Sequence, residues 1–536
     1  MTGGEILVRS LEAQGVSTVV GMPGNQNIWI YDSLPDSTID SYLIRNEQGA
    51  TLIANGYARA TGDVGVALTV PGPGSTNAST GIVDAYTDSV PVLLITGGTE
   101  VALDGRDRSK CFHGLDQQAF FAPITRAFER PSSVDQIPES VERVFAALRA
   151  PRPGPAVLEL PVDIAAQSGD VRIPDRIVSP QLQQPDDHQL STCASTIDGF
   201  ERPVILVGKN VADTDAAGQV SALSSRLNAP ILFTRLGKGA LSDAHPAVKG
   251  HCHAKVGRSL LSEADGLIAI GCRFTQIDTR SWQLPIPERI VQIDVDAYEL
   301  GREYDIEAGA SGPLAETVEA VTTRITREPD SDWSTAVSKT VSDIRSAMPP
   351  LELFSAIRKH TDGDAIFSVD VTSFGYRSFD ELPIYGPRMF LYPCHSVTLG
   401  YGLPGAIGAK LGMPDRQVIA FCGDGGYQMT SFELATAVEH GIGITVVVVN
   451  DGSLSAIRGS QAKTFDGRVC DTDMKVPRIA DAAIAFGARG IRIEDADRFE
   501  SVFADVVGHE GPTVIEVVMT EQRDQIIQRV PWLYPD

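Results

Sequence analysis

Short apolar runs alternate with helical patterns along the first third of the chain. Apolar positions recur every three or four residues over 5–14 and 49–61, which predicts two helices. Apolar runs over 18–20, 64–69 and 91–96 predict strands between and after these helices. Because strands that alternate with helices along a chain form parallel sheets covered by helices, we expect an α/β domain here.

The same alternation returns twice. Polar, proline-containing stretches over 169–189 and 327–350 separate the units, and the second stretch is expected to hold a helix. The strands predicted in the second and third units cover 204–207, 231–234, 266–270, 289–293, 365–369, 418–421, 445–449 and 513–518. The expected fold class is therefore α/β, with three doubly wound domains that each have a mainly parallel sheet. Their expected ranges are 1–168, 186–328 and 350–522, followed by a C-terminal tail over 523–536.

Charge and composition argue against several classes of function. The 536-residue chain carries 45 Lys and Arg against 69 Asp and Glu, a formal net charge of −24, so nucleic acid and acidic membrane surfaces are not expected as partners. The longest candidate apolar run, 442–449, is shorter than the ~18 residues of a membrane span. The first residues lack the pattern of a secretory signal, so we expect a cytoplasmic enzyme. The seven cysteines include no C-x-x-C pair, and neither a zinc site nor a disulfide framework is predicted.

The strongest local signal for chemistry is an apolar strand that ends in Gly423-Asp424-Gly425-Gly426, before a helical pattern over 431–439. Glycines at such a turn let backbone N–H groups approach a phosphate, while a carboxylate holds a divalent cation beside it. A second strand, over 445–449, ends in Asn450-Asp451-Gly452-Ser453. Each motif alone is also an ordinary turn, but the two together predict one site for a metal and a diphosphate. A nicotinamide site is less favoured, because no G-x-G-x-x-G motif follows a predicted strand with an acidic residue about 20 positions on.

These two turns resemble the thiamine diphosphate motif of the superfamily that contains pyruvate decarboxylase and acetolactate synthase. The resemblance extends over nearly the whole chain, through the segments 45–50, 56–62, 72–77, 84–91, 152–163 and 400–408. It implies a pyrimidine-binding first domain, a central domain and a diphosphate-binding third domain. It also implies thiamine diphosphate and Mg²⁺ as cofactors.

The resemblance assigns cofactor contacts to individual residues. It places the carboxyl group of Glu47 at N1′ of the aminopyrimidine, in the proton transfer that activates the cofactor. By pattern alone, Glu47 is also a solvated carboxylate at a helix start. The resemblance places Leu399 under the bend of the cofactor, although this residue also fits an ordinary core position, and gives the carbonyl of Val397 a hydrogen bond from the 4′-amino group.

The resemblance also assigns the diphosphate and metal contacts. The residues that it implies contact the diphosphate end of the cofactor are Gly423, Asp424, Gly425, Gly426, Asp451 and Ser453. Mg²⁺ is held by Asp424, by the side chain of Asp451 and by the backbone carbonyl of Ser453. The commoner pair in the family at 450–451 is Asn-Asn, so Asp451 adds a negative charge that a cation must balance.

Three further residues are expected near the substrate. Asn25 lies where the family has a residue that faces the cofactor, but it also fits a turn after Pro-Gly. His113 lies where pyruvate decarboxylases have a histidine and acetolactate synthases a glutamine, so it is either a proton carrier or a structural residue. Ile457 lies where pyruvate-type decarboxylases have a glutamate that protonates the product carbon, and an aliphatic side chain offers no proton. This favours carboligation, although benzoylformate-type decarboxylases also have an apolar residue here.

The predicted function is that of an acetolactate-synthase-like carboligase, which decarboxylates a 2-oxo acid and transfers the acyl carbanion to a second carbonyl compound. A decarboxylase that releases an aldehyde is the alternative, and a catalytically inactive regulatory relative is a remote one. FAD is a possible further cofactor in the central domain but is not favoured. Because the two cofactor-binding domains meet across a subunit interface in the family, we expect a homodimer or homotetramer with its site at that interface.

Overall fold

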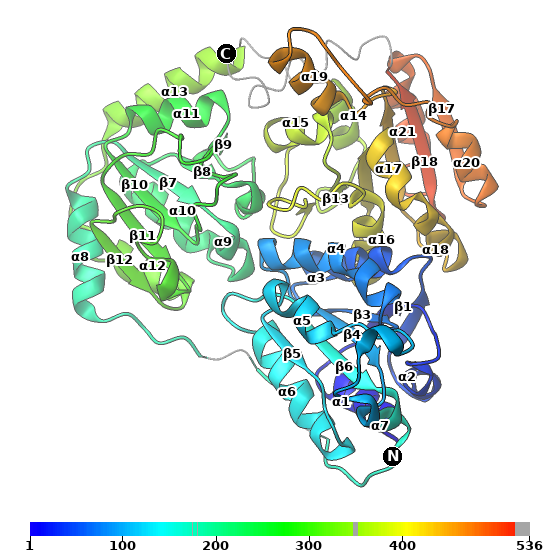
Figure 1. Cartoon of the computed structure of the whole chain (residues 1–536). Helices are drawn as coiled ribbons and strands as arrows, with labels where there is room; N and C mark the ends of the chain where they lie inside the picture. Colours follow the sequence, from blue (N-terminus) through cyan, green and yellow to red (C-terminus); the bar gives the residue numbers. More distant parts are fainter. Residues whose placement is uncertain (174, 179–180, 347–351, 520–536) are drawn as a thin grey trace.

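The computed structural model describes residues 1–173, 175–178, 181–346 and 352–519. The chain forms three lobes, each built on a six-stranded sheet with helices against it (Figure 1). All the strand pairs within these sheets are parallel. The prediction of three α/β domains with parallel sheets is confirmed. The predicted boundary at 350 and the tail over 523–536 lie outside the described residues.

In each sheet the first strand is an internal one, and later strands are added on both sides of it, as in doubly wound folds. The strand orders are β2-β1-β3-β4-β6-β5, β12-β11-β10-β7-β8-β9 and β14-β13-β15-β16-β18-β17. The first sheet contains β1 (Thr18–Gly21), β2 (Asp40–Leu43), β3 (Gly65–Thr69), β4 (Val92–Gly98), β5 (Ala127–Glu129) and β6 (Ala156–Pro161). The second contains β7 (Pro203–Val207), β8 (Ile231–Phe233), β9 (Val248–His251), β10 (Gly266–Ile270), β11 (Ile290–Asp294) and β12 (Ala308–Ser311). The third contains β13 (Ile366–Val369), β14 (Phe390–Leu391), β15 (Val418–Gly423), β16 (Thr445–Asn450), β17 (Arg489–Ile493) and β18 (Thr513–Val518).

The helices are distributed over all three domains. The first domain has α1 (Gly3–Ala13), α2 (Ile28–Ser33), α3 (Glu47–Thr61), α4 (Pro73–Asp88), α5 (Gln117–Phe121), α6 (Ile137–Leu148) and α7 (Val162–Ala166). The central domain has α8 (Asp187–Asp198), α9 (Lys209–Asp213), α10 (Ala217–Leu227), α11 (Lys255–Glu263) and α12 (Leu314–Thr322), and α13 (Ser331–Ser346) packs against α11. The third domain has α14 (Glu352–Lys359), α15 (Ser373–Glu381), α16 (Gly402–Gly412), α17 (Asp424–Thr430), α18 (Leu434–Glu439), α19 (Ser455–Thr464), α20 (Ile479–Ala485) and α21 (Phe499–Val506).

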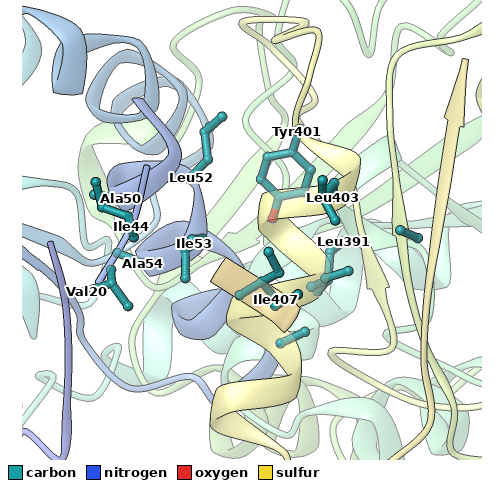
Figure 2. Packing of buried hydrophobic residues seen from close by; sticks show 14 of the residues in the cluster. Val20, Ile44, Ala50, Leu52, Ile53, Ala54, Leu391, Tyr401, Leu403 and Ile407 are labelled. Carbon is teal, nitrogen blue, oxygen red and sulfur yellow. The ribbon is translucent and has the colours of Figure 1, made fainter. Parts of the chain in front are cut away.

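Helices α3 and α16 join the first and third domains. A Cβ at Gly56 would lie 2.2 Å from the carbonyl oxygen of Gly405, and one at Gly408 would lie 1.9 Å from that of Ile53. Only glycine permits this approach of two helix backbones. Apolar residues of both domains, among them Ile53 and Ile407, form one continuous buried cluster across this contact (Figure 2). The first and third domains of one chain are therefore packed together through a shared core.

Two helix starts differ from the sequence predictions. The helix expected over 49–61 already begins at Glu47, because the side chain of Asn46 accepts a hydrogen bond from the N–H of Gln48 and caps it. The helix expected after the glycine-rich turn, over 431–439, is preceded by α17, which begins at Asp424. Gly425 and Gly426 thus lie in the first turn of a helix rather than in a loop.

The connecting segments contain more helix than the sequence indicated. Helix α8 begins within the stretch predicted as a linker over 169–189, because Asp186 and Gln189 form a reciprocal capping box. The second connection holds α13, as predicted. Within the described ranges, none of the helices combines the length and the apolar character that a membrane span needs.

Candidate cofactor site

The diphosphate turn and the Asn450 turn lie side by side at the carboxyl end of the third sheet. Strands β15 and β16 are neighbours, with Gly423 paired to Val449. Asp424 follows directly, and its two carboxylate oxygens accept hydrogen bonds from the N–H of Gly425 (2.8 Å) and the N–H of Gly452 (2.9 Å). The carboxylate of Asp424 therefore connects the two turns, which is the convergence that their spacing predicts.

The side chains proposed as metal ligands are buried together. Asp451 accepts from the N–H of Ser453 (3.1 Å) and from the hydroxyl of Ser455 (2.6 Å). Burial, and then the charge of Asp451, raise the pKa of Asp424 to about 6. Two nearby buried carboxylates are costly without a cation, and carboxylate and carbonyl oxygens are the ligands that Mg²⁺ takes. The residues present at this turn fit a divalent cation.

Asp370 is a site residue that the sequence analysis missed. It follows β13, is fully buried, and accepts hydrogen bonds from the N–H groups of Gly400 (3.1 Å) and Gly402 (3.3 Å). A Cβ at Gly426 would lie 2.8 Å from its Oδ2, so this carboxylate lies directly against α17. Burial raises its pKa to about 6. Asp370 joins the segment that carries Leu399 to the diphosphate turn, and its position directly after a predicted strand was the signal available for it.

The segment between β14 and α16 holds Val397 and Leu399 in an unusual backbone. Val397 has φ +52°, a left-handed conformation that a β-branched residue rarely adopts. Three residues on, the carbonyl of Gly400 accepts a hydrogen bond from the hydroxyl of Thr430 (2.8 Å). Leu399 is half-buried and so keeps part of its side chain accessible. Strain of this kind persists where surrounding contacts enforce it, and it concentrates at functional sites.

Glu47 and His113 lie on two sides of one turn in the first domain. The amide nitrogen of Asn77 donates to Glu47 Oε2 (3.0 Å), and a Cβ at Gly74 would lie 3.3 Å from Glu47 Oε1. His113 has φ +54° and stacks on Phe112 with ring centroids 4.0 Å apart. A Cβ at Gly72 would lie 3.2 Å from His113. The turn that leads into α4 thus brings both predicted residues into one region.

One alternative for Asn25 is that its side chain stabilises the turn after Pro-Gly. In the structure, the side chain that stabilises this turn is that of Asn27. Asn27 is fully buried, accepts from the N–H of Gly24 (2.8 Å) and donates to the carbonyl of Met22 (3.1 Å). Asn25 is exposed on the same turn. The structure therefore leaves Asn25 accessible while Asn27 fixes the backbone, and a contact between Asn25 and substrate remains a prediction.

The predicted site residues fall into two groups within one chain. Glu47 and His113 contact residues of the first domain, whereas Asp424 and Asp451 contact residues of the third. Elements of both groups expose large apolar side chains: Ile28, Phe112, Met429, Ile457 and Phe465.

The two joined turns fit a metal diphosphate, and comparisons with known proteins identify the family. Residues 1–120 match the N-terminal TPP binding domain of thiamine pyrophosphate enzymes, residues 190–321 the central domain, and residues 370–517 the C-terminal TPP binding domain. The chain belongs to the thiamine pyrophosphate enzymes. Its membership supports thiamine diphosphate as the cofactor and action on carbon–carbon bonds.

Curated relatives cover nearly the full length. The chain is 34% identical to a probable 2-ketoarginine decarboxylase of Pseudomonas aeruginosa, over 96% of this chain and 94% of the relative. It is 30% identical to the acetolactate synthase large subunit of Lactococcus lactis, over 99% and 94%. It is 28% identical to the acetolactate synthase isozyme 1 large subunit of Escherichia coli, over 99% and 96%.

Proposed function

We propose that this protein is an acetolactate-synthase-like carboligase, which decarboxylates a 2-oxo acid and joins the acyl group to a second carbonyl compound. The observation that carries the proposal is the side chain of Ile457. The hydroxyl of Ser455, at the start of α19, donates to Asp451, so α19 is fixed to the metal-binding turn. Ile457 follows two residues later and is 55% exposed in the single chain. Its side chain has no proton to deliver to the product carbon.

The other residues have defined roles in this proposal. Thiamine diphosphate, when bound, would supply the carbon that adds to the 2-oxo acid and would accept the electron pair that stays behind when CO₂ leaves. Asp424, Asp451 and the Ser453 carbonyl hold Mg²⁺ against the diphosphate. Glu47 holds and moves a proton at N1′ of the pyrimidine, the Val397 carbonyl accepts from the amino group, and Leu399 supports the bend.

His113 and Asn25 are proposed to face the substrate. His113 lies across the Gly72–Gly74 turn from Glu47, and Asn25 is exposed on the β1–α2 turn. In this proposal the imidazole of His113 carries protons to or from the substrate. A purely regulatory chain has no chemical need for Glu47 and the Asp424–Asp451 pair together.

The decarboxylase that releases an aldehyde is the second candidate. It is favoured by the 34% identity to a probable 2-ketoarginine decarboxylase, whereas the acetolactate synthases among the relatives favour ligation. Both reactions share the steps up to loss of CO₂. They differ in whether the product carbon takes a proton or a second carbonyl compound, which is the step in which Ile457 takes part.

A flavin is not part of the proposal. A doubly wound domain binds nucleotides at the carboxyl ends of its central strands, here β7 and β10. A Cβ at Gly208 would lie 2.1 Å from the carbonyl oxygen of Gly271, so the turns after these two strands pack directly against each other. Beside them, Arg152 is ion-paired to the buried Asp294 at 2.7 Å. These contacts narrow the space at the strand ends without closing it, because Gly208, Lys209 and Gly271 also line a small cavity there.

The active assembly is proposed to be a homodimer or homotetramer. The first-domain group around Glu47 and the third-domain group around Asp424 each form half a site, and both expose apolar side chains. Sedimentation equilibrium of the chain with cofactor and Mg²⁺ is expected to show dimers or larger assemblies in every active sample. Full activity in a sample that contains only monomer would contradict a shared site.

The distribution of products tests the reaction assignment. Wild-type protein with thiamine diphosphate, Mg²⁺, a 2-oxo acid and excess aldehyde is expected to form mainly ligated product, measured by mass spectrometry over a panel of 2-oxo acids. Ile457→Glu is expected to raise the ratio of free aldehyde to ligated product roughly tenfold or more, since a positioned acid contributes about 10²–10⁴-fold to proton transfer.

The matched control is Ile484→Glu, which adds the same carboxyl group to an equally exposed isoleucine on α20 of the same domain. This variant is expected to keep the wild-type product ratio. If the wild type releases only aldehyde from its best 2-oxo acid under excess acceptor, the decarboxylase becomes the better account.

A further inference from the structure

The segment that carries Val397 and Leu399 is held by the first domain of the same chain. Asp88, the last residue of α4, is fully buried and accepts hydrogen bonds from the backbone N–H groups of Cys394 (2.8 Å) and His395 (3.0 Å). One carboxylate thus fixes the backbone two residues before Val397.

The ring of His395 extends this contact to the central domain. Its Nδ1 bonds to Asp88 at 2.6 Å, and its Nε2 lies 3.5 Å from the carboxylate of Asp278. The His395 side chain is only 11% exposed. Asp88, His395 and Asp278 belong to the first, third and central domains, so a single imidazole links all three.

The charges around the ring favour the imidazolium form. Burial opposes the charge, but Cys394, Asp88 and Asp278 raise the pKa of His395 well above its ordinary value. Burial also raises the pKa of the Cys394 thiol, and the two carboxylates are the groups that contact the ring nitrogens of His395. Other ionisable groups near the triad come from all three domains. They include Arg59, Asp84 and Arg152 of the first domain, Lys209, Arg235, Cys252, His253, Cys272 and Arg273 of the central domain, and Tyr401 of the third.

We propose that His395 is a positioning residue: held between Asp88 and Asp278, it fixes the backbone of segment 394–399 so that Val397 and Leu399 face the cofactor. The inference rests on the cofactor contacts in the proposed function. Neutral asparagine at 395 still reaches Asp88 but loses the positive charge and the link to Asp278. The strained Val397 then lacks one of the contacts that enforce its conformation.

The remaining contacts of the segment predict that such a variant still folds. The hydroxyl of Thr398 donates to Asp84 (3.0 Å), and the hydroxyls of Thr87 and Ser396 share a hydrogen bond (2.9 Å). Asp88 also keeps its 2.6 Å ion pair with Arg59. The expected change is therefore local to the 394–399 segment.

Hydrogen–deuterium exchange on the chain without cofactor tests the first half of the proposal. In His395→Asn, exchange of peptides covering 394–400 is expected to speed up about tenfold or more, the effect of losing one charge-assisted hydrogen bond. Asp278→Asn, which keeps the ring and Asp88, is expected to show a smaller increase. The control is His360→Asn, since His360 pairs with Glu500 at the surface of the same domain. Wild-type exchange rates in His395→Asn would overturn the proposal.

The effect of His395→Asn on exchange over 394–400 is also expected to depend on pH. Because the folded-state pKa of His395 is raised, its contribution is complete below the ordinary value of about 6.5 and is lost as pH rises through the raised value. After correction for intrinsic exchange, wild type and His395→Asn are therefore expected to converge at alkaline pH. Asp88 has a lowered pKa, so its own contribution is lost only in acid. A difference that does not depend on pH would contradict the role of the charge.

Cofactor titration tests the second half. His395→Asn is expected to bind thiamine diphosphate about tenfold more weakly and to lose kcat, with KM for the 2-oxo acid little changed. Faster exchange with unchanged cofactor affinity and kcat would overturn positioning toward the cofactor. A wild-type chain that does not bind thiamine diphosphate would instead contradict the proposed function itself.

Discussion

Glu47→Gln is expected to lower turnover roughly 10²-fold or more while thiamine diphosphate still binds. The amide preserves the shape of the side chain and its contact with Asn77, but it cannot exchange a proton with N1′. General acid–base groups contribute about 10²–10⁴-fold to rate, so loss of this one proton transfer is sufficient for the predicted decrease. Steady-state turnover of the best 2-oxo acid, with cofactor affinity measured separately by titration calorimetry, checks both parts.

The matched control for this variant is Glu139→Gln. Glu139 is also an acidic residue in the first turn of a first-domain helix, α6, and it pairs with Arg143 at the surface. Any general effect of removing a helix-start carboxylate appears in both variants, because both lose the same interaction with the helix dipole. Near-normal turnover in Glu47→Gln would remove this residue from the mechanism.

The parts of the fold that the sequence predicted are those with local signals. The run over 445–449 is apolar at nearly every position, and β16 is buried throughout. The strand and the polar turn after it could therefore be predicted from the sequence. The start of α17 at Asp424 was missed because Gly-Asp-Gly-Gly has low helix propensity. The backbone N–H groups in the first turn of α17 are also the groups that can bind a phosphate.

The residues that the sequence did not reveal act through distant contacts. His395 is 307 residues from Asp88 and 117 from Asp278, and no local pattern links three such positions. Asp370 follows a strand that was predicted, but a single aspartate after an apolar run has no paired motif to distinguish it from a turn residue. Tertiary packing alone brings these groups together.

Asp424 is expected to be the residue on which metal-dependent cofactor binding depends most. Its carboxylate accepts hydrogen bonds from the N–H groups of Gly425 and Gly452. It lies beside Asp451, where the two turns meet. Asp424→Asn keeps the size of the side chain but removes the charge that attracts the cation. Since loss of partners outside the ligand shell alone costs roughly 10–100-fold in metal affinity, we expect Mg²⁺-dependent binding of thiamine diphosphate to weaken about 100-fold or more.

Titration calorimetry with and without Mg²⁺ separates this effect from general damage. Asp481→Asn, which changes a surface aspartate in the first turn of α20, is expected to bind as the wild type does. Asp451→Asn restores the pair that is commoner in the family and is expected to retain cofactor binding, because asparagine still offers an oxygen to the metal. If Asp424→Asn binds the cofactor with wild-type affinity and the same dependence on Mg²⁺, the metal is held elsewhere. In that case the buried Asp424–Asp451 pair serves only to join the two turns.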